Sequence, residues 1–157
     1  MIRTFIADDE PLILRSIKKS IEETNEHFKI IGHATDGHNA YKLIQELKPD
    51  VIFTDIRMPV ISGLELIKRL REQGNQSTIV LLSGYKEFEY AKEAIRLSVV
   101  DYLIKPINPE LLKSILTEIH DKWSLSLKQR QYDYLENVAE GVPDARLFPA
   151  EKSFWAI

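Results

Sequence analysis

The sequence predicts an α/β fold in which a parallel sheet carries helices on both faces, and two patterns predict it. Short apolar runs alternate five times with longer stretches whose apolar residues recur every three or four positions. The third and fourth runs, 51–54 and 78–82, are apolar at consecutive positions rather than at alternate ones. A strand that is buried on both faces has this pattern, as in a parallel sheet between two helical layers. Right-handed crossovers then give an open, doubly wound sheet of five strands.

Each expected strand is followed by an expected helix. The strands are expected at 5–7, 28–34, 51–54, 78–82 and 102–104. The helices are expected where apolar side chains recur at helical spacing, at 13–21, 40–47, 64–70, 88–95 and 111–119. Turn-forming residues, among them Pro49, Pro59 and Gly84, bound the third and fourth strands. The pattern therefore indicates one α/β domain over about the first 120 residues.

The composition is that of an ordinary soluble protein and excludes several functions. With 157 residues, the chain is long enough for one domain and an appendage. A formal net charge of −3 argues against a protein that works chiefly on nucleic acid or on a membrane surface. The absence of cysteine excludes disulfides, cysteine-based zinc or iron–sulfur sites and a thiol nucleophile. No apolar run approaches the roughly 20 residues of a membrane span, and residues 1–9 lack the apolar core of a signal peptide, so we expect a cytoplasmic protein without a membrane partner.

Chemically useful side chains stand where four of the expected strands end, and in doubly wound sheets these ends line the binding crevice. The first strand ends in 8–10, an Asp-Asp-Glu sequence, the third in Asp55, the fourth in Ser83 and the fifth in Lys105. Carboxylates this close repel one another, and a hard divalent cation such as Mg²⁺ relieves the repulsion. A pocket balanced by Mg²⁺ and one ammonium can accept a phosphoryl group on a carboxylate, with Ser83 and the backbone N–H groups after Asp55 as donors to its oxygens. Taken singly, each of these residues could equally be a helix cap or part of a turn.

Four segments carry a resemblance to a known family: 5–11, 51–59 with Gly63, 81–84 and 101–106. They resemble the receiver domain of two-component response regulators, and the resemblance covers about residues 2–121. It implies a flavodoxin-like sheet with the strand order 2-1-3-4-5. It also implies a cis peptide bond before Pro106, which is plausible because proline lowers the cis penalty to about 1 kcal/mol or less.

The same resemblance implies a function for the crevice. Asp55 would take a phosphoryl group from the phosphohistidine of a sensor histidine kinase, and Ser83 and Lys105 would contact the phosphoryl oxygens. The implied magnesium ligands are Asp8, Asp9, Asp55 and the backbone carbonyl of Arg57. We therefore expect a phosphoacceptor switch rather than an enzyme, with Mg²⁺-dependent self-phosphorylation and autodephosphorylation.

Tyr102 matches the aromatic switch position of the family. On phosphorylation of Asp55, Ser83 should move toward the phosphate and Tyr102 should rotate inward, which biases the surface formed by the fourth helix, fifth strand and fifth helix. We expect this face to form a homodimer. The alternative for Tyr102 is a strand aromatic that packs in the core.

Residues 83–95 also resemble a subgroup, the receivers that precede an AraC-type helix-turn-helix DNA-binding domain. The expected output is therefore transcription, with DNA bound only through a domain absent from this chain. One departure from the family is Ser98-Val99, where many receivers have Gly-Ala. The turn after the fourth helix should be costlier with serine if it needs a positive φ.

The residues after the receiver read as a helix followed by a connection. Apolar side chains continue the stripe of the fifth helix at a roughly heptad spacing, which Gln131 interrupts. The stripe consists of Leu112, Leu116, Ile119, Trp123, Leu127, Tyr134 and Val138. We expect a signalling helix at 122–140 that could pair with a second copy in a coiled coil, or alternatively fold back onto its own receiver. Residues 141–157 read as a connection to a missing output domain.

Three other functions compete with a receiver that controls transcription. A stand-alone receiver would act through a protein partner instead of DNA. An aspartate-nucleophile phosphatase of the haloacid-dehalogenase type would carry a second aspartate two residues after the nucleophile, where this chain has Arg57. A flavodoxin-like FMN binder would have a first loop rich in Ser, Thr and Gly, whereas residues 8–11 are acidic and repel phosphate without a metal.

Overall fold

The computed structural model describes residues 1–84 and 88–141, with the elements in the order that the sequence predicts. The chain divides into two units, Met1–Thr117 and Glu118–Ile157, and the sheet lies in the first. The strands are β1 (Ile2–Ala7), β2 (Phe28–Ala34), β3 (Val51–Asp55), β4 (Thr78–Ser83) and β5 (Asp101–Ile104). The helices are α1 (Pro11–Thr24), α2 (Gly37–Leu47), α3 (Gly63–Glu72), α4 (Phe88–Arg96) and α5 (Pro109–Ala139).

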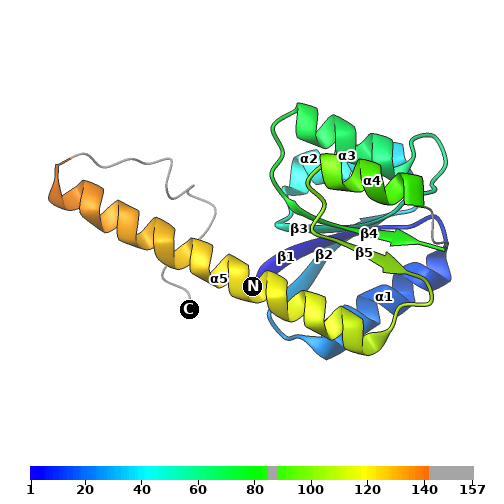
Figure 1. Ribbon diagram of the computed structural model, residues 1–157, viewed down its shortest axis with the longest axis horizontal. Coiled ribbons are helices and arrows are strands. Elements are labelled where there is room, and N and C mark those ends of the chain that lie inside the picture. The colour runs from blue at the N-terminus through cyan, green and yellow to red at the C-terminus, as the bar shows by residue number, and fades with distance from the viewer. Residues whose placement is uncertain (85–87, 142–157) are drawn as a thin grey trace. The chain divides into compact units, whose positions relative to one another are not determined.

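The sheet is parallel throughout, with the strand order β2-β1-β3-β4-β5, so the predicted fold and strand order are confirmed. Helix α1 and the first turns of α5 cover one face, and α2, α3 and α4 cover the other (Figure 1). Because all the strands run in one direction, the carboxyl ends of β1, β3, β4 and β5 meet at one edge of the sheet.

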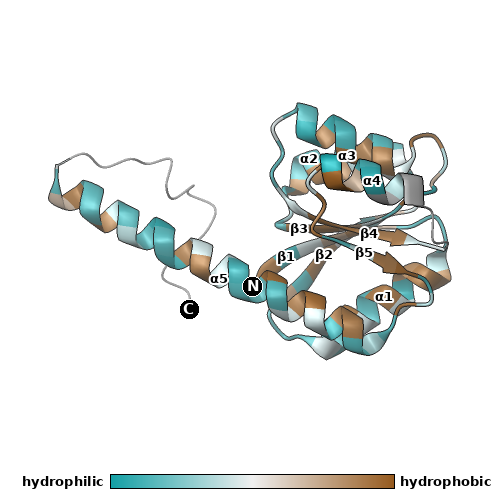
Figure 2. Ribbon diagram, viewed as in Figure 1, coloured by the Kyte–Doolittle hydropathy of each residue, from teal (hydrophilic) through white to brown (hydrophobic). Residues whose placement is uncertain are grey.

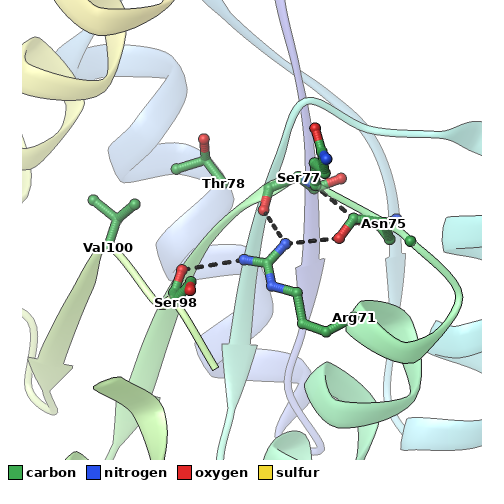
Figure 3. Close-up of a pocket in the computed structure, with 8 residues that line it drawn as sticks. Arg71, Asn75, Ser77, Thr78, Ser98 and Val100 are labelled. Carbon is green, nitrogen blue, oxygen red and sulfur yellow. Dashed lines mark hydrogen bonds between the residues drawn. The ribbon is translucent and has the colours of Figure 1, made fainter. Parts of the chain in front are cut away.

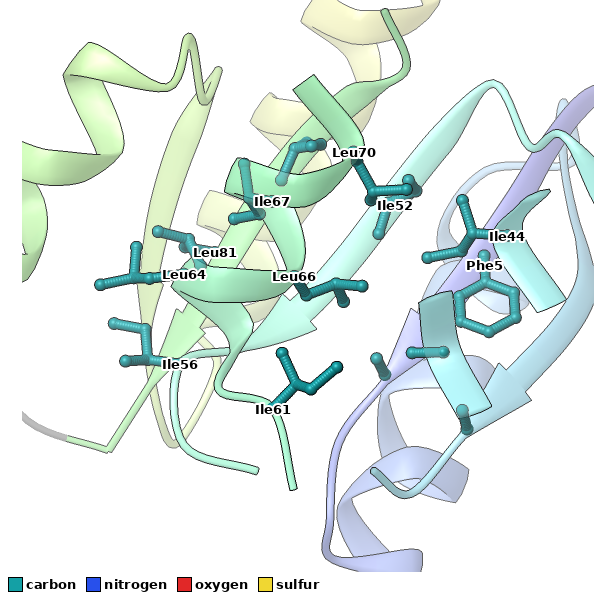
Figure 4. Close-up of a cluster of buried hydrophobic side chains, with 14 of the residues drawn as sticks. Phe5, Ile44, Ile52, Ile56, Ile61, Leu64, Leu66, Ile67, Leu70 and Leu81 are labelled. Carbon is teal, nitrogen blue, oxygen red and sulfur yellow. The ribbon is translucent and has the colours of Figure 1, made fainter. Parts of the chain in front are cut away.

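The core explains why the third and fourth apolar runs do not alternate. Phe5, Ile52 and Leu81 join one cluster with side chains from α2 and α3 (Figure 4). Ile6 and Phe53, the next residues along β1 and β3, are fully buried as well, and successive strand residues point to opposite faces. In Figure 2, β4 and β5 are coloured largely as hydrophobic, which agrees with their position between two layers of helices. Burying each such side chain stabilises the fold by about 1.5–3 kcal/mol.

The loop after β3 is held in place by short-range features of the sequence. Ser62 caps α3 by accepting a hydrogen bond from the backbone N–H of Glu65 (3.2 Å). The N–H of Gly63 donates to the carbonyl of Ile56 (2.7 Å), and a Cβ at Gly63 would overlap the carbonyl oxygen of Asp55. Only glycine therefore lets α3 begin directly against the end of β3, which fixes the backbone that carries Asp55.

The turn after α4 does require a positive φ. Ser98 has a φ of 57°, a left-handed conformation that costs most residues other than glycine about 1 kcal/mol or more. The serine that stands where many receivers have glycine therefore carries the expected penalty.

Helix α5 continues well past the receiver, which confirms the predicted C-terminal helical extension. Within the second unit, Leu125, Tyr132 and Val138 are exposed, whereas Trp123 and Leu127 are half-buried. The expected connection at 141–157 lies, apart from Gly141, outside the described residues. Among the described residues, no helix is both long enough and apolar enough to cross a membrane.

Candidate functional site

Lys105 joins the ends of three strands in a partly buried acidic cluster, called the pocket below. Asp8 follows β1 and is fully buried, and Asp55 ends β3 with 6% of its surface exposed. The Nζ of Lys105, which follows β5, lies 2.6 Å from Oδ2 of Asp8 and 3.4 Å from Oδ2 of Asp55. Residues far apart in the sequence thus meet at the carboxyl edge of the sheet, where the strand-end pattern predicts the crevice.

Three consecutive carboxylates form a cluster beside this lysine. Oxygens from Asp8, Asp9 and Glu10 lie within 4.8 Å of one another, and the Lys105 Nζ is 4.0 Å from Oε1 of Glu10. The backbone N–H of Glu10 donates to Oδ1 of Asp8 (3.0 Å), and the buried Oδ2 of Asp8 has the Lys105 ammonium 2.6 Å away as its charged partner. A buried carboxylate oxygen in an all-oxygen set suits a hard divalent cation.

Glu10 was not among the expected ligands. The sequence places it in the Asp-Asp-Glu run at the strand end, but the resemblance assigns a ligand role only to its two neighbours. Its backbone N–H bond to Asp8 turns the chain so that all three carboxylates face the same region.

Burial and charge oppose each other at Asp55. Burial raises the pKa of Asp55 to about 6, the nearby carboxylates of Asp8 and Asp9 raise it too, and Lys105 lowers it. For Lys105, burial lowers the pKa, but its bonds and charge interactions with Asp8 and Asp55 outweigh burial and raise it above its ordinary value. The lysine therefore stays charged at neutral pH, and Asp55 is an ionised carboxylate held at an energetic cost.

Ser83 ends β4 between the strands of Asp55 and Lys105. It is buried, its carbonyl accepts a hydrogen bond from the backbone N–H of Lys105 (2.7 Å), and the preceding residue, Leu82, pairs with Asp55 across the sheet. The peptide bond from Lys105 to Pro106 is cis.

The first expected backbone donor after Asp55 already has a hydrogen-bond partner. The first backbone N–H after Asp55, that of Ile56, donates to the carbonyl of Leu82 (3.0 Å) and so extends the sheet. The Ile56 N–H is thus used by the sheet in this structure, and the contact of backbone N–H groups after Asp55 with a phosphoryl group stays a prediction. Arg57, the next residue, has an exposed side chain.

Tyr102 lies in β5 with its side chain half-buried. It packs against the core cluster between the sheet and α2–α4. The ring thus contacts the core cluster while staying partly exposed, and both a core role and a rotation on phosphorylation stay predictions.

Comparison with known proteins identifies the family. The model of the response regulator receiver domain matches residues 4–117. The chain belongs to the response regulator receiver domain family. This receiver domain shares 37% identity with the transcriptional regulatory protein YesN of Bacillus subtilis (strain 168) over 166 aligned residues, covering 95% of the chain and 45% of YesN. It shares 38% identity with the transcriptional regulatory protein HptR of Staphylococcus aureus (strain NCTC 8325 / PS 47) over 116 residues. That match covers 74% of this chain and 45% of HptR.

Solved structures show the same likeness. The REC domain of AraT, a response regulator from Geobacillus stearothermophilus, is 38% identical with a TM-score of 0.72, and the match covers 79% of this chain and 96% of that one. The response regulatory domain of protein mrkE from Klebsiella pneumoniae is 27% identical with a TM-score of 0.73. That match covers 79% of this chain and 99% of the mrkE domain. This receiver domain spans less than half the length of the curated relatives named above. The family membership leaves the haloacid-dehalogenase and FMN alternatives without support.

Proposed function

We propose that this receiver domain is a phosphorylation-controlled switch whose Asp55 accepts a phosphoryl group from the phosphohistidine of a sensor histidine kinase. The observation that carries the proposal is the lysine-bridged pocket, in which one ammonium lies 2.6 Å from Asp8 and 3.4 Å from Asp55. A nearly buried carboxylate at a strand end, with a cation beside it and an acidic cluster next to that, has the parts that phosphoryl transfer needs.

In the proposed step, an Asp55 carboxylate oxygen attacks phosphorus while the phosphorus–nitrogen bond to the kinase histidine breaks. The histidine nitrogen keeps that electron pair, so the kinase returns to its unmodified form. The Lys105 ammonium offsets charge on the phosphoryl oxygens, and the Ser83 hydroxyl donates a hydrogen bond to one of them.

The residues that would hold Mg²⁺ are Asp8, Asp9, Asp55 and the backbone carbonyl of Arg57, with Glu10 beside them. When bound, the ion offsets the negative charge of the carboxylates and the phosphoryl group. Without the ion, burial, together with the neighbouring carboxylates of Asp8 and Asp9, holds the pKa of Asp55 above its ordinary range.

Acetyl phosphate provides the direct test. With Mg²⁺, the parent protein should gain the mass of one phosphoryl group, and Asp55→Asn should gain at least about a hundredfold less because its amide is not a nucleophile. Intact-protein mass spectrometry measures the gain. Glu46→Gln, an exposed change on α2, is the matched control and should behave like the parent. Equal labelling of Asp55→Asn and the parent would contradict the proposal.

Phosphorylation would act on the surface that includes Tyr102. Ser83 would move toward the phosphoryl group, Tyr102 would rotate inward, and the surface of α4, β5 and α5 would then pair with a second copy. Three exposed apolar side chains support this surface: Ile95 on α4, Val100 before β5 and Leu111 on α5.

Beryllofluoride, a phosphoryl mimic, is expected to shift the protein from monomer to dimer. Ile95→Asp should prevent the shift because a carboxylate would be buried in the pairing surface. Sedimentation velocity with Mg²⁺ measures the change. Leu12→Asp on α1, which alters a side chain as exposed as Ile95 (78% against 77%), is the control and should still dimerise. An unchanged monomer of the parent under saturating beryllofluoride would argue against the dimer.

The proposed output is transcription through an AraC-type domain outside this chain. We divide the chain into a receiver at 2–121, a signalling helix at 122–140, whose stripe could pair in a coiled coil, and a connection at 141–157. The resemblance of residues 83–95 and the names of YesN and HptR as transcriptional regulatory proteins favour this output. A stand-alone receiver that acts through a protein partner is the alternative, and the complete reading frame separates the two.

A further inference from the structure

Arg71, in the last turn of α3, binds four backbone carbonyls from two loops. Its Nη1 donates to the carbonyls of Asn75 and Ser77 (2.9 Å each), in the loop between α3 and β4. Its Nε donates to the carbonyl of Leu97 (3.0 Å) and its Nη2 to that of Ser98 (3.2 Å), at the end of α4. Figure 3 shows the guanidinium between the two loops, and Arg71 is among the residues that line a pocket of about 390 Å³. One side chain thus ties α4 to the body of the domain.

Two of the carbonyls that Arg71 binds, those of Leu97 and Ser98, lie directly after the last residue of α4. Helix α4 closes with a Schellman motif, in which the N–H of Val99 donates to Ala94 and the N–H of Ser98 to Ile95 (3.1 Å each). This motif satisfies carbonyls inside the helix but not those of Leu97 and Ser98, which Arg71 takes. The guanidinium also places a positive charge where the helix dipole is negative.

The described partners of Arg71 are backbone carbonyls. Among the residues that the structure describes, none forms an ion pair with Arg71, and burial lowers the pKa of the guanidinium. Arginine nevertheless remains charged in proteins. Its four described hydrogen bonds all go to backbone carbonyls, and two of them make it a cap supplied to the end of α4 by another helix.

Few of the described side chains of α4 are fully buried. Of its described side chains, Ala94 alone is buried, whereas α3 buries Leu64, Leu66, Ile67 and Leu70. Segments with few buried apolar groups open at a low free energy. The bonds from Arg71 therefore add to the packing of Leu97 and Val99 against the core cluster in fixing the end of α4, on either side of a serine in a left-handed conformation.

We infer that Arg71 is a positioning residue that anchors the C-terminal end of α4, so that a change at Ser83 moves the helix about this fixed end and reaches Tyr102. The second half of this inference rests on the proposed function. Ser83 lies before α4 in the chain and Tyr102 lies after it. If Arg71 fixes the C-terminal end of α4, a movement that begins at Ser83 changes the position of the helix and therefore the surroundings of Tyr102.

Hydrogen exchange tests the anchor. In Arg71→Met, the amides of Ser98 and Val99 should exchange at least about tenfold faster than in the parent, because a charged hydrogen-bond donor is lost at that turn. The amides of Ile6 and Phe53 at the centre of the sheet should not change. Arg69→Met, on the same helix but in an exposed ion pair with Glu65, is the control. Ser98→Gly, which relieves the left-handed strain, should partly rescue the Arg71→Met variant.

A second measurement distinguishes an anchor that transmits the switch from a residue that only stabilises the fold. Arg71→Met should bind beryllofluoride within about twofold of the parent affinity, since no pocket residue is altered, yet dimerise at least about tenfold more weakly. Arg71→Lys, a milder variant that keeps the charge but not the fork of donors, should be intermediate. Unchanged exchange at Ser98 and Val99, or equal acceleration in the sheet, would overturn the anchor. Unchanged dimerisation would overturn the coupling. Failure of the parent to bind beryllofluoride would overturn the proposed function and the coupling with it, while exchange still decides the anchor.

Discussion

Replacing Lys105 with methionine is expected to lower the free energy of unfolding by about 3 kcal/mol at neutral pH in metal-free buffer. The variant keeps most of the apolar stem but removes the ammonium. In the parent, this ammonium lies 2.6 Å from the carboxylate of Asp8 and 3.4 Å from that of Asp55. Only 13% of the Lys105 side chain is exposed, so water replaces the lost charge poorly. Urea denaturation in EDTA measures the difference.

Two further variants show whether the loss is electrostatic. Lys68→Met, an exposed change on α3, should leave the stability within about 0.5 kcal/mol of the parent. Combining Lys105→Met with Asp55→Asn should recover part of the loss, because the neutral amide removes one of the uncompensated charges. A Lys105→Met protein as stable as the parent would show that the pocket is not held by this ion pair.

Asp55→Asn is expected to have the opposite effect, raising the free energy of unfolding by about 2 kcal/mol at neutral pH without metal. The folded pKa of about 6 lies above the ordinary value of 3.8, chiefly because of burial. Between these values the folded protein keeps a proton that the unfolded chain has lost, so this carboxyl's contribution to stability falls as the pH rises through the window. Asparagine carries no charge and escapes that loss, while Asp8 still pairs with Lys105.

The pH profile distinguishes this cause from better packing. The advantage of Asp55→Asn should disappear below about pH 4, where the parent carboxyl is protonated in both the folded and unfolded states. Added Mg²⁺ should stabilise the parent more than the variant, since the variant lacks one carboxylate of the acidic group. Glu46→Gln should show neither dependence. A constant advantage at every pH would mean that the charge of Asp55 is not what destabilises the parent.

Much of the fold was predictable because local patterns encode it. The consecutive apolar residues of 51–54 indicate burial on both faces, and the structure buries every residue of β3. The stripe that continues past Ile119 predicts a long last helix, and α5 reaches Ala139. The strand order could not be predicted from local patterns, because it depends on which strands become neighbours in the sheet. Only the family resemblance predicted it.

The pocket was predictable by residue type but not by detailed geometry. Parallel strands bring Asp8, Asp55 and Lys105 to one edge, so their meeting follows from topology. The position of Glu10 and the engagement of the Ile56 N–H depend on the turn and on how far the ladder extends, which no periodicity encodes. Arg71 had no signal in the sequence, because its partners are backbone carbonyls up to 27 positions away.

The most direct test of the account is the position of the phosphoryl group in the chain. After acetyl phosphate and Mg²⁺, borohydride reduces an aspartyl phosphate to homoserine, and tandem mass spectrometry of peptides locates the converted residue. The account predicts conversion at Asp55 alone, suppressed when EDTA is present during labelling. Conversion at Asp8 or Asp9 with Asp55 intact, or none in a protein that binds Mg²⁺, would contradict it.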